Sequence, residues 1–355
     1  MIKEKILAIL KETQIDALLI SDGYNVRYIS GFSGATGYLY ISSARQVIMT
    51  DSRYTMQARQ ESKEFEVVES SADKSYAKMI NDYLKTDKAR CVGFEDQHFI
   101  YADLMTIKNG CDIPKWIPLG DTINRLRVIK TPEEIEKLAM AESIGDQAFT
   151  YILDILKPGI TELEVAARLE CFMKLHGAEG LSFDTIVASG RHSAMPHAAP
   201  SRKKLEYGDF VTMDYGCLYE GYCSDMTRTV VIGKAGEKQK KIYGVVLEAQ
   251  LRALDGIIAG KTGQEIDAIA RRIIEQAGYG AYFGHGLGHS VGLYIHEEPR
   301  LSPVSTVTLQ ENMIETVEPG IYVPDFGGVR IEDMVAVTQD GCRNLTNSPK
   351  HLIEI

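Results

Sequence analysis

The sequence lacks several features that would assign it to a common functional class. Acidic residues exceed basic ones, 49 to 39, and give a formal net charge of −10. No basic run opposes this excess, so neither a nucleic-acid partner nor an anionic-membrane surface is expected. No apolar run approaches the ~18 residues that a membrane span needs. The six cysteines are scattered without CxxC spacing, which favours free thiols in a reducing, cytoplasmic environment.

The length and patterning of the chain predict two domains. A chain of 355 residues is long for one hydrophobic core. Helical and strand-like segments alternate over residues 1–122, which predicts a small α/β domain with a mostly parallel or mixed sheet. The second domain is expected over residues 123–355. Its first helix has a clear start signal, because Thr131 can cap it, Pro132 fits the first helical position and Glu134 completes a capping box.

The second domain carries a faint internal repeat. Residues 148–164 (AFTYILDILKPGITELE) and 249–265 (AQLRALDGIIAGKTGQE) align without gaps. Each copy predicts a helix, a glycine-containing turn, a capping threonine and a second helix. We therefore expect two related halves about a pseudo-axis. The repeat also explains GIIAGKT (256–262) as an interhelical turn and not as a phosphate-binding loop.

Two acidic residues lie on strands that the pattern predicts to pair. In DFVTMDYGCLYEGYCSDMTRTVVI (209–232), two β-rich runs flank LYEGY, which is a hairpin signal. If Tyr219 and Glu220 form the loop, Asp214 lies directly opposite Asp225. Like charges in this position are destabilising, so two facing aspartates on apolar strands need a functional reason.

A second predicted hairpin repeats this arrangement. In IETVEPGIYVPDFGGVRIEDMV (314–335), Glu318 and Glu332 are symmetric about Asp325 and therefore face each other. The register is an assumption in both hairpins, and a slip of one residue would move a carboxylate to the other face. Either hairpin alone could also be an exposed acidic ladder.

Histidines are concentrated in FGHGLGHSVGLYIHEEP (283–299), which holds His285, His289 and His296 among four glycines. Together with two facing carboxylate pairs, one imidazole gives a ligand set for Mn²⁺, Co²⁺ or Zn²⁺, with enough charge for two ions. Two such ions can hold a bridging hydroxide, which is a hydrolytic nucleophile. The HxxxH spacing does not indicate a zincin site, because glycines interrupt the helix and no glutamate lies between the histidines.

These residues and their contexts resemble the pita-bread metallopeptidases, which include Xaa-Pro aminopeptidase, Xaa-Pro dipeptidase (prolidase) and methionine aminopeptidase. The resemblance covers the whole catalytic domain and rests on MDYG, SDMTRT, HGLGHSVGL, VEPGIY and GGVRIED. The domain before it resembles the creatinase/prolidase-type N-terminal domain. The resemblance implies an α/β N-terminal domain followed by an α+β pita-bread catalytic domain with an internal pseudo-two-fold repeat.

The resemblance also implies roles for individual residues. Two divalent ions, Mn²⁺ foremost, would be held by Asp214, Asp225, His289, Glu318 and Glu332. Glu318 would in addition carry the proton from the bridging water to the leaving nitrogen. The other implied residues are the catalytic His197 and His296, which would position the scissile peptide and stabilise the oxyanion, and the substrate-binding His285, Arg330 and Tyr322.

Some of these residues have simpler interpretations. His197 lies in the turn-like SAMPHAAP and could be an ordinary loop histidine. Arg330 could neutralise Glu332, because residues two apart share a strand face. The remaining histidines match no motif and are expected to be surface or structural residues: His98, His176, His192 and His351.

The expected function is that of a cytoplasmic, dinuclear exopeptidase that releases the N-terminal residue preceding proline. Xaa-Pro aminopeptidase is the preferred form. A dipeptidase that acts only on dipeptides stays open, because the choice depends on whether the N-terminal domain closes the cleft beyond proline. Methionine aminopeptidases usually lack a β/α domain of this size, and a non-catalytic binding protein would not need all five ligands. Proline-containing peptides are the expected substrates, and the resemblance alone implies a homodimer.

Overall fold

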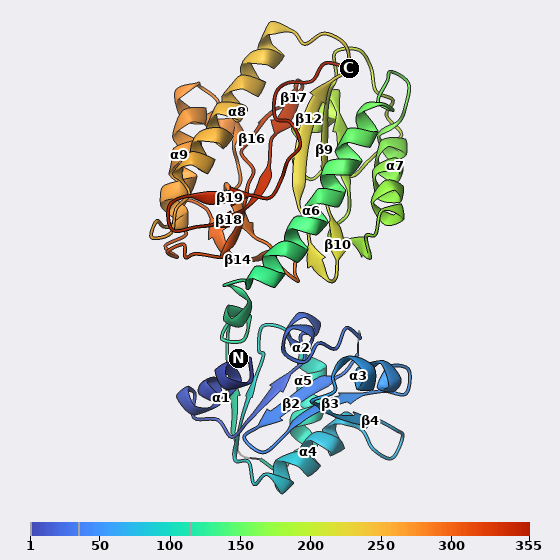
Figure 1. Cartoon of the computed structure of the whole chain (residues 1–355), viewed down its shortest axis with the longest axis vertical. Helices are drawn as coiled ribbons and strands as arrows, with labels where there is room; N and C mark the ends of the chain where they lie inside the picture. Colours follow the sequence, from blue (N-terminus) through green and yellow to red (C-terminus); the bar gives the residue numbers. More distant parts are fainter. Residues whose placement is uncertain (1, 35, 114) are drawn as a thin grey trace. The chain divides into compact units, whose positions relative to one another are not determined.

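The alternation of helical and strand-like segments early in the chain produces a separate α/β unit. The computed structural model describes residues 2–34, 36–113 and 115–355. The chain divides into two units, Met1–Arg127 and Val128–Ile355 (Figure 1). Among the described residues, no helix is both long and apolar enough to cross a membrane.

The first unit ends with a 3-10 turn, η1 (Asn124–Arg127). The boundary predicted from the sequence, between residues 122 and 123, lies just before this turn. Hydrogen bonds tie the turn to the first unit: Asn25 Nδ2 donates to Asn124 Oδ1 at 2.8 Å, and Arg127 donates to Asn25 Oδ1. The side chain of Arg127 is buried by these contacts.

The first unit is a six-stranded sheet covered by helices on both faces. Its helices are α1 (Ile2–Glu12), α2 (Gly23–Ser30), α3 (Thr55–Glu61), α4 (Tyr76–Thr86) and α5 (Tyr101–Asn109). Its strands are β1 (Ala17–Ile20), β2 (Tyr38–Ser42), β3 (Gln46–Thr50), β4 (Glu66–Glu69), β5 (Cys91–Phe94) and β6 (Lys115–Pro118). The order is β4-β3-β2-β1-β5-β6, and β1 pairs antiparallel with β2 but parallel with β5, so the sheet is mixed. Helices α1, α2 and α3 pack on one face, and α4 and α5 on the other.

Two helix pairs open the two halves of the second unit: α6 (Pro132–Leu153) with α7 (Glu162–Leu175), and α8 (Glu237–Gly256) with α9 (Gly263–Gln276). The second helix of each pair starts with a capping box, at Thr161 for α7 and at Thr262 for α9. The structure thus confirms the repeated helix–turn–helix. The predicted capping box at the start of α6 is also present.

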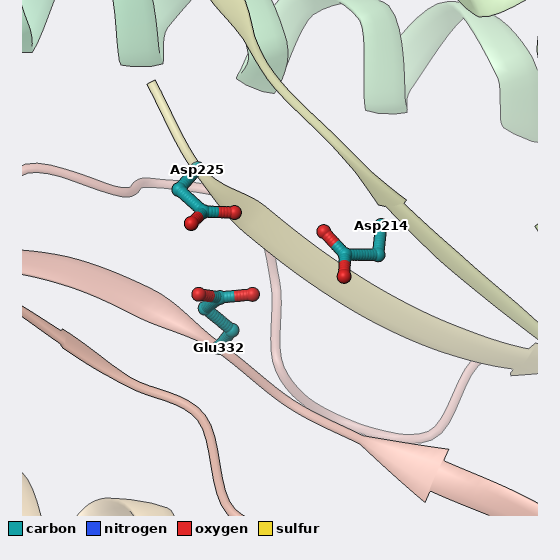
Figure 2. A group of neighbouring side chains, drawn as sticks. All are labelled: Asp214, Asp225 and Glu332. Atoms are coloured by element: carbon teal, nitrogen blue, oxygen red, sulfur yellow. The ribbon is translucent and has the colours of Figure 1, made fainter. Parts of the chain in front are cut away.

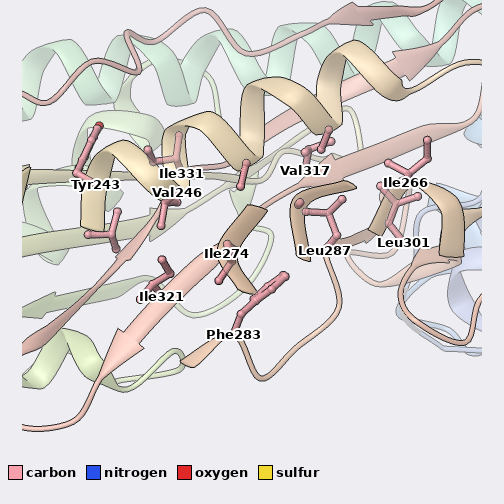
Figure 3. Close-up of a cluster of buried hydrophobic side chains, with 14 of the residues drawn as sticks. Tyr243, Val246, Ile266, Ile274, Phe283, Leu287, Leu301, Val317, Ile321 and Ile331 are labelled. Atoms are coloured by element: carbon pink, nitrogen blue, oxygen red, sulfur yellow. The ribbon is translucent and has the colours of Figure 1, made fainter. Parts of the chain in front are cut away.

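Each helix pair covers its own group of strands. The strands are β7 (Gly180–Leu181), β8 (Ile186–Ser189), β9 (Phe210–Tyr215), β10 (Cys217–Tyr219), β11 (Tyr222–Cys223), β12 (Met226–Val231), β13 (Gly288–Ser290), β14 (Glu297–Leu301), β15 (Ile314–Val317), β16 (Gly320–Val323), β17 (Gly327–Arg330), β18 (Asp333–Val337) and β19 (Cys342–Asn344). Leu169 of α7 packs with Val211 of β9. Val246 of α8 and Ile266 of α9 pack with Val317 of β15 (Figure 3). Burial of each such side chain contributes ~1.5–3 kcal/mol, so these strands are held firmly and can position polar groups on their opposite faces.

The first hairpin has a register two residues away from the predicted one. Its turn is formed by Glu220 and Gly221, which both have positive φ, at 47° and 81°. This is the requirement of the tight turns that suit hairpins, and glycine meets it without strain. Asp214 is consequently paired with Thr227 and not with Asp225. Because side chains alternate with a period of two, the corrected register still leaves both aspartates on one face.

The second hairpin has the predicted register. Both of its ladders, β15 with β18 and β16 with β17, are symmetric about Asp325. Glu318 and Glu332 lie opposite each other in the gap between these ladders. Their backbone N–H groups donate to the carbonyl oxygens of Leu287 and Thr227, at 2.9 and 3.1 Å. Each glutamate is therefore fixed by a neighbouring segment of the second unit.

Candidate active site

Three carboxylates from separate segments converge in the second unit. Asp214 lies in β9, Asp225 lies between β11 and β12, and Glu332 lies between β17 and β18. Oxygens of the three groups lie within 4.8 Å of one another (Figure 2). Each residue is at most 8% exposed. Carboxylates this close repel one another unless a cation or protons lie among them.

His289, in β13, and Glu318 extend this group. The Nε2 atom of His289 lies 3.4 Å from Asp225 Oδ2 and 3.4 Å from Glu318 Oε1. Its Nδ1–H donates to the carbonyl oxygen of Ser290 at 3.1 Å, which leaves the lone pair of neutral Nε2 directed at the carboxylates. Burial lowers the pKa of His289 to about 3, so the imidazole is in the neutral form that ligates metals.

Burial and mutual repulsion raise the pKa values of the carboxylates. Desolvation raises the pKa of Glu318 to about 7. Desolvation, and next repulsion from Glu332, raises the pKa of Asp225. For Glu332 the causes of the raised pKa are desolvation and then repulsion from Glu318. Full ionisation of this group at neutral pH therefore needs cations.

The residues fit a divalent metal centre. Asp214 Oδ1 is buried and has no hydrogen-bond partner within the described part of the chain. A buried oxygen left without a partner costs roughly 1–3 kcal/mol, and a charged one costs more. Figure 2 shows the carboxylates of Asp214, Asp225 and Glu332 turned toward one another. Carboxylate oxygens with one imidazole are ligands that suit Mn²⁺, Co²⁺ and Zn²⁺.

A chain of hydrogen bonds links Asp214 to His285. Arg330 Nη2 donates to Asp214 Oδ2 at 2.6 Å, and Arg330 Nη1 donates to the Tyr322 hydroxyl at 2.7 Å. The hydroxyl donates onward to His285 Nε2 at 3.0 Å, and His285 Nδ1–H donates to the carbonyl of Gly286 at 2.7 Å. Because a guanidinium can only donate, the chain has one direction and fixes the tautomer of His285. Burial lowers the pKa of His285 to about 4, so this histidine is neutral.

The charge of Arg330 acts to lower the pKa of Glu332, as the simpler interpretation of the sequence proposed, but the two side chains form no direct ion pair. The hydroxyl of Thr227 lies between them: it accepts from Arg330 Nε at 3.0 Å and donates to Glu332 Oε2 at 2.6 Å. No role for Thr227 was predicted from the sequence. A signal was present, since Thr227 follows Asp225 by two residues and alternation places both on one face.

The carboxylates and His289 line a cavity of about 580 Å³. The histidines predicted to contact substrate, His197, His285 and His296, line it as well, as does Arg330. The ring of His296 packs edge-on against that of His289, with centroids 4.7 Å apart. The apolar part of the wall includes Phe183, Ile186, Pro196, Ala198 and Ile295.

Two residues depart from the predicted set. Tyr322 is not part of the cavity wall; it lies behind it, buried, with its hydroxyl against His285 and Arg330. Arg300 lines the cavity, although no role for it was predicted from the sequence. Arg300 lies opposite His289 in the ladder of β13 and β14, which no pattern in the sequence indicated.

Comparisons with known proteins agree with this architecture. The model of metallopeptidase family M24 matches residues 136–339, and that of the creatinase/prolidase N-terminal domain matches residues 3–129. The Xaa-Pro dipeptidase of Pyrococcus furiosus is 41% identical over 351 residues, which cover 99% of each chain.

Two solved structures of similar fold are also Xaa-Pro peptidases. An Xaa-Pro dipeptidase from Bacillus anthracis has a TM-score of 0.96 and 43% identity, over 99% of this chain and 98% of that one. An X-Pro aminopeptidase from Thermotoga maritima has a TM-score of 0.91 and 39% identity, over 96% and 98%. The family and the fold class implied by the sequence resemblance are confirmed, and the family is one of peptidases that use divalent metal ions. The chain belongs to metallopeptidase family M24, with a creatinase/prolidase N-terminal domain joined to a pita-bread catalytic domain.

Proposed function

We propose that the protein is a dinuclear exopeptidase that releases the N-terminal residue preceding proline, as an Xaa-Pro aminopeptidase. The observation that carries the proposal is the convergence of buried carboxylates and a neutral histidine in the wall of one cavity. Two divalent ions, with Mn²⁺ as the proposed metal, would be held by Asp214, Asp225, His289, Glu318 and Glu332. When bound, the ions supply a water activated for hydrolysis at neutral pH.

Glu318 is the proposed proton carrier. Its carboxylate lines the cavity beside the other proposed ligands, so it could take a proton from the activated water and release it to the proline nitrogen. The hydroxyl of Thr316 donates to Glu318 Oε1 at 3.1 Å and keeps the carboxylate oriented.

The histidines of the cavity wall would bind and orient the substrate. His197 and His296 are exposed within the cavity, so a peptide can reach both. In the proposal they donate to the carbonyl of the scissile bond and stabilise the oxyanion that develops there. His285 and Arg330 would contact the proline end, and Tyr322 would act by holding these two side chains in place.

Substrate length separates two candidate activities. The cavity volume, about 580 Å³, lies within the range of sites that bind drug-sized ligands, so a peptide longer than a dipeptide can enter, which is compatible with an aminopeptidase. Arg300 favours a dipeptidase as the second candidate, because its guanidinium in the cavity wall can pair with the free carboxylate of a dipeptide. The relatives from Pyrococcus and Bacillus are named dipeptidases, and the one from Thermotoga an aminopeptidase.

The test is cleavage of Ala-Pro and Ala-Pro-Ala by Mn²⁺-loaded protein, with a chelated control. Chelator-sensitive cleavage of the tripeptide supports the aminopeptidase, and cleavage of the dipeptide alone supports the dipeptidase. If neither peptide is cleaved with any of Mn²⁺, Co²⁺ and Zn²⁺, the proposed specificity is wrong. Light scattering on the same sample tests the homodimer that the sequence resemblance implies.

A further inference from the structure

One buried glutamate holds both ends of the loop that carries His197. Residues 189–201, here called the His197 loop, run from the end of β8 past the cavity. Glu162, the first residue of α7, is fully buried beneath this loop. Its Oε1 accepts from the backbone N–H and the hydroxyl of Ser189, both at 2.7 Å. Its Oε2 accepts from the N–H and the hydroxyl of Ser201, at 3.0 and 2.6 Å.

A further donor comes from within the loop. The Nδ1 atom of His192 lies 2.9 Å from Glu162 Oε2. Burial disfavours the charged form of Glu162, but the hydrogen bonds from Ser201, Ser189 and His192 outweigh it and lower the pKa of this carboxyl. Glu162 is therefore an ionised acceptor with five donors, and charge-assisted hydrogen bonds are the strong ones. The backbone adds a direct contact, since the N–H of Leu163 donates to the carbonyl of Ser201 at 3.1 Å.

The part of the loop between these anchors forms one wall of the cavity, through Pro196, His197, Ala198, Ala199 and Pro200. Within the loop, the hydroxyl of Ser193 accepts from the N–H of Gly328 at 2.8 Å. The carbonyl of Pro196 accepts a weaker bond from Arg330 Nη1 at 3.4 Å. His197 itself is exposed and makes no hydrogen bond with the described residues, so its position depends on the loop that carries it.

The second half of the catalytic domain also has a buried carboxylate that anchors a segment of the cavity wall. Asp267, on α9, is buried and accepts two hydrogen bonds from Arg271, at 2.7 and 2.8 Å. It also accepts from the N–H of Leu287 at 3.1 Å, while Arg271 donates to the carbonyl of His285 at 2.9 Å. In each half, a buried carboxylate on the second helix of the repeat holds a segment that brings a histidine to the cavity.

We propose that Glu162 is a positioning residue: it fixes the His197 loop so that His197 meets the scissile peptide in one orientation. The inference rests on the proposed role of His197 in catalysis. Displacing a substrate-orienting group by about 1 Å can cost ~100-fold in rate, so an anchor distant from the chemistry can control it.

The first variant is Glu162→Gln, with Glu164→Gln as its matched control. Glutamine keeps the size of the side chain but turns an amide donor toward groups that also donate. Glu164 is two residues further along α7 and caps the helix through Thr161; glutamine can serve in the same capping box. In the Mn²⁺-loaded full-length protein, we expect kcat/KM for Ala-Pro and Ala-Pro-Ala to fall about 10- to 100-fold in E162Q. The metal content should stay at the wild-type value, and E164Q should retain wild-type kcat/KM.

A double-mutant cycle with His197→Ala separates positioning from general structural damage. If Glu162 acts through His197, E162Q lowers kcat/KM in the wild-type background and has no further effect in the H197A background. If E162Q does not fold, Ser201→Ala replaces it, since this change removes one donor at the end of the loop and keeps the carboxylate. Equal losses in both backgrounds, or wild-type activity of E162Q, would overturn the inference on Glu162 alone. Wild-type activity of H197A would instead refute the proposed role of His197, and the inference with it.

Discussion

Arg330 Nη2 and Asp214 Oδ2 are 2.6 Å apart, and both side chains are almost completely withdrawn from solvent. The pair neutralises one of the carboxylates of the candidate active site. It also directs the second oxygen of Asp214 toward the others, because Oδ2 is occupied by the guanidinium. The ion pair thus orients a proposed metal ligand as well as balancing its charge.

Substitution of Arg330 by methionine should be strongly destabilising. Removing one partner of a buried ion pair leaves an uncompensated charge and costs about 3–5 kcal/mol. We expect a loss of this size in the free energy of unfolding, measured with urea in the presence of a chelator. Arg343→Met is the control, because Arg343 pairs with Glu136 at the surface, where such pairs contribute ~0–1 kcal/mol. Equal stability of the two variants would show that the buried pair does not hold the site together.

Asparagine at position 225 should remove metal binding together with peptidase activity. Asp225 is the residue that contacts both His289 and the other carboxylates, so its charge is central to the proposed ligand set. We expect Asp225→Asn to lose at least one bound Mn²⁺ by elemental analysis and more than ~100-fold in kcat/KM. Asp184→Asn is the matched control: Asp184 lines the same cavity but is exposed and lies outside the carboxylate group. Unchanged metal content and activity in D225N would exclude the proposed site.

Metal removal should make the protein sensitive to rising pH. Desolvation raises the pKa of Glu318 to about 7, above the ~4.3 of an unfolded glutamate. A raised pKa gives stability that is fully present at low pH and is lost as pH rises through about 7. The Tm of chelator-treated protein should therefore fall from pH 5 to pH 8, and Mn²⁺ should raise Tm more at pH 8. The slope should be smaller in Glu318→Gln, which cannot titrate; an equal effect of Mn²⁺ at both pH values would contradict this account.

Arg300→Met should affect peptides with a free proline carboxylate if the dipeptidase candidate is right. A hydrogen bond between charged groups contributes about 1.5–3 kcal/mol, which corresponds to a rise of roughly 10- to 100-fold in KM for Ala-Pro. Ala-Pro-amide is the control substrate, because it lacks the negative charge and should be cleaved equally by the variant and the wild type. A similar loss on both substrates would mean that Arg300 does not recognise the carboxylate.

The sequence predicted the second carboxylate hairpin better than the first, and the turns explain the difference. The second hairpin is centred on Asp325, and its symmetric register follows from the positions of the flanking strands. In the first, either Tyr219–Glu220 or Glu220–Gly221 fits a two-residue loop. Both residues of such a turn need positive φ, and this requirement selects the pair that contains glycine.

Other features of the fold and the site could not be predicted from sequence patterns, because they are short or depend on tertiary contacts. Helix α2 has only eight residues and lies between a capping Asp22 and a left-handed Gly31, so its periodicity is too short to detect. Strand β6 is recognisable only by its parallel pairing with β5. The anchor role of Glu162 depends on five donors that are 27 to 39 residues away along the chain.

The division of the carboxylates between the two hairpins has a consequence for the ancestry of the site. Asp214 and Asp225 come from the first half of the internal repeat, and Glu318 and Glu332 from the second. The first half alone offers two of the five proposed ligands and the second offers three, since His289 also belongs to it. A single unduplicated module would therefore have needed a second copy of itself to enclose the proposed ions. When both modules belong to one chain, the two halves associate within a single molecule. Their effective concentration then no longer depends on the protein concentration. Fusion also frees the two halves to diverge, which is how one hairpin could keep aspartates while the other carries glutamates.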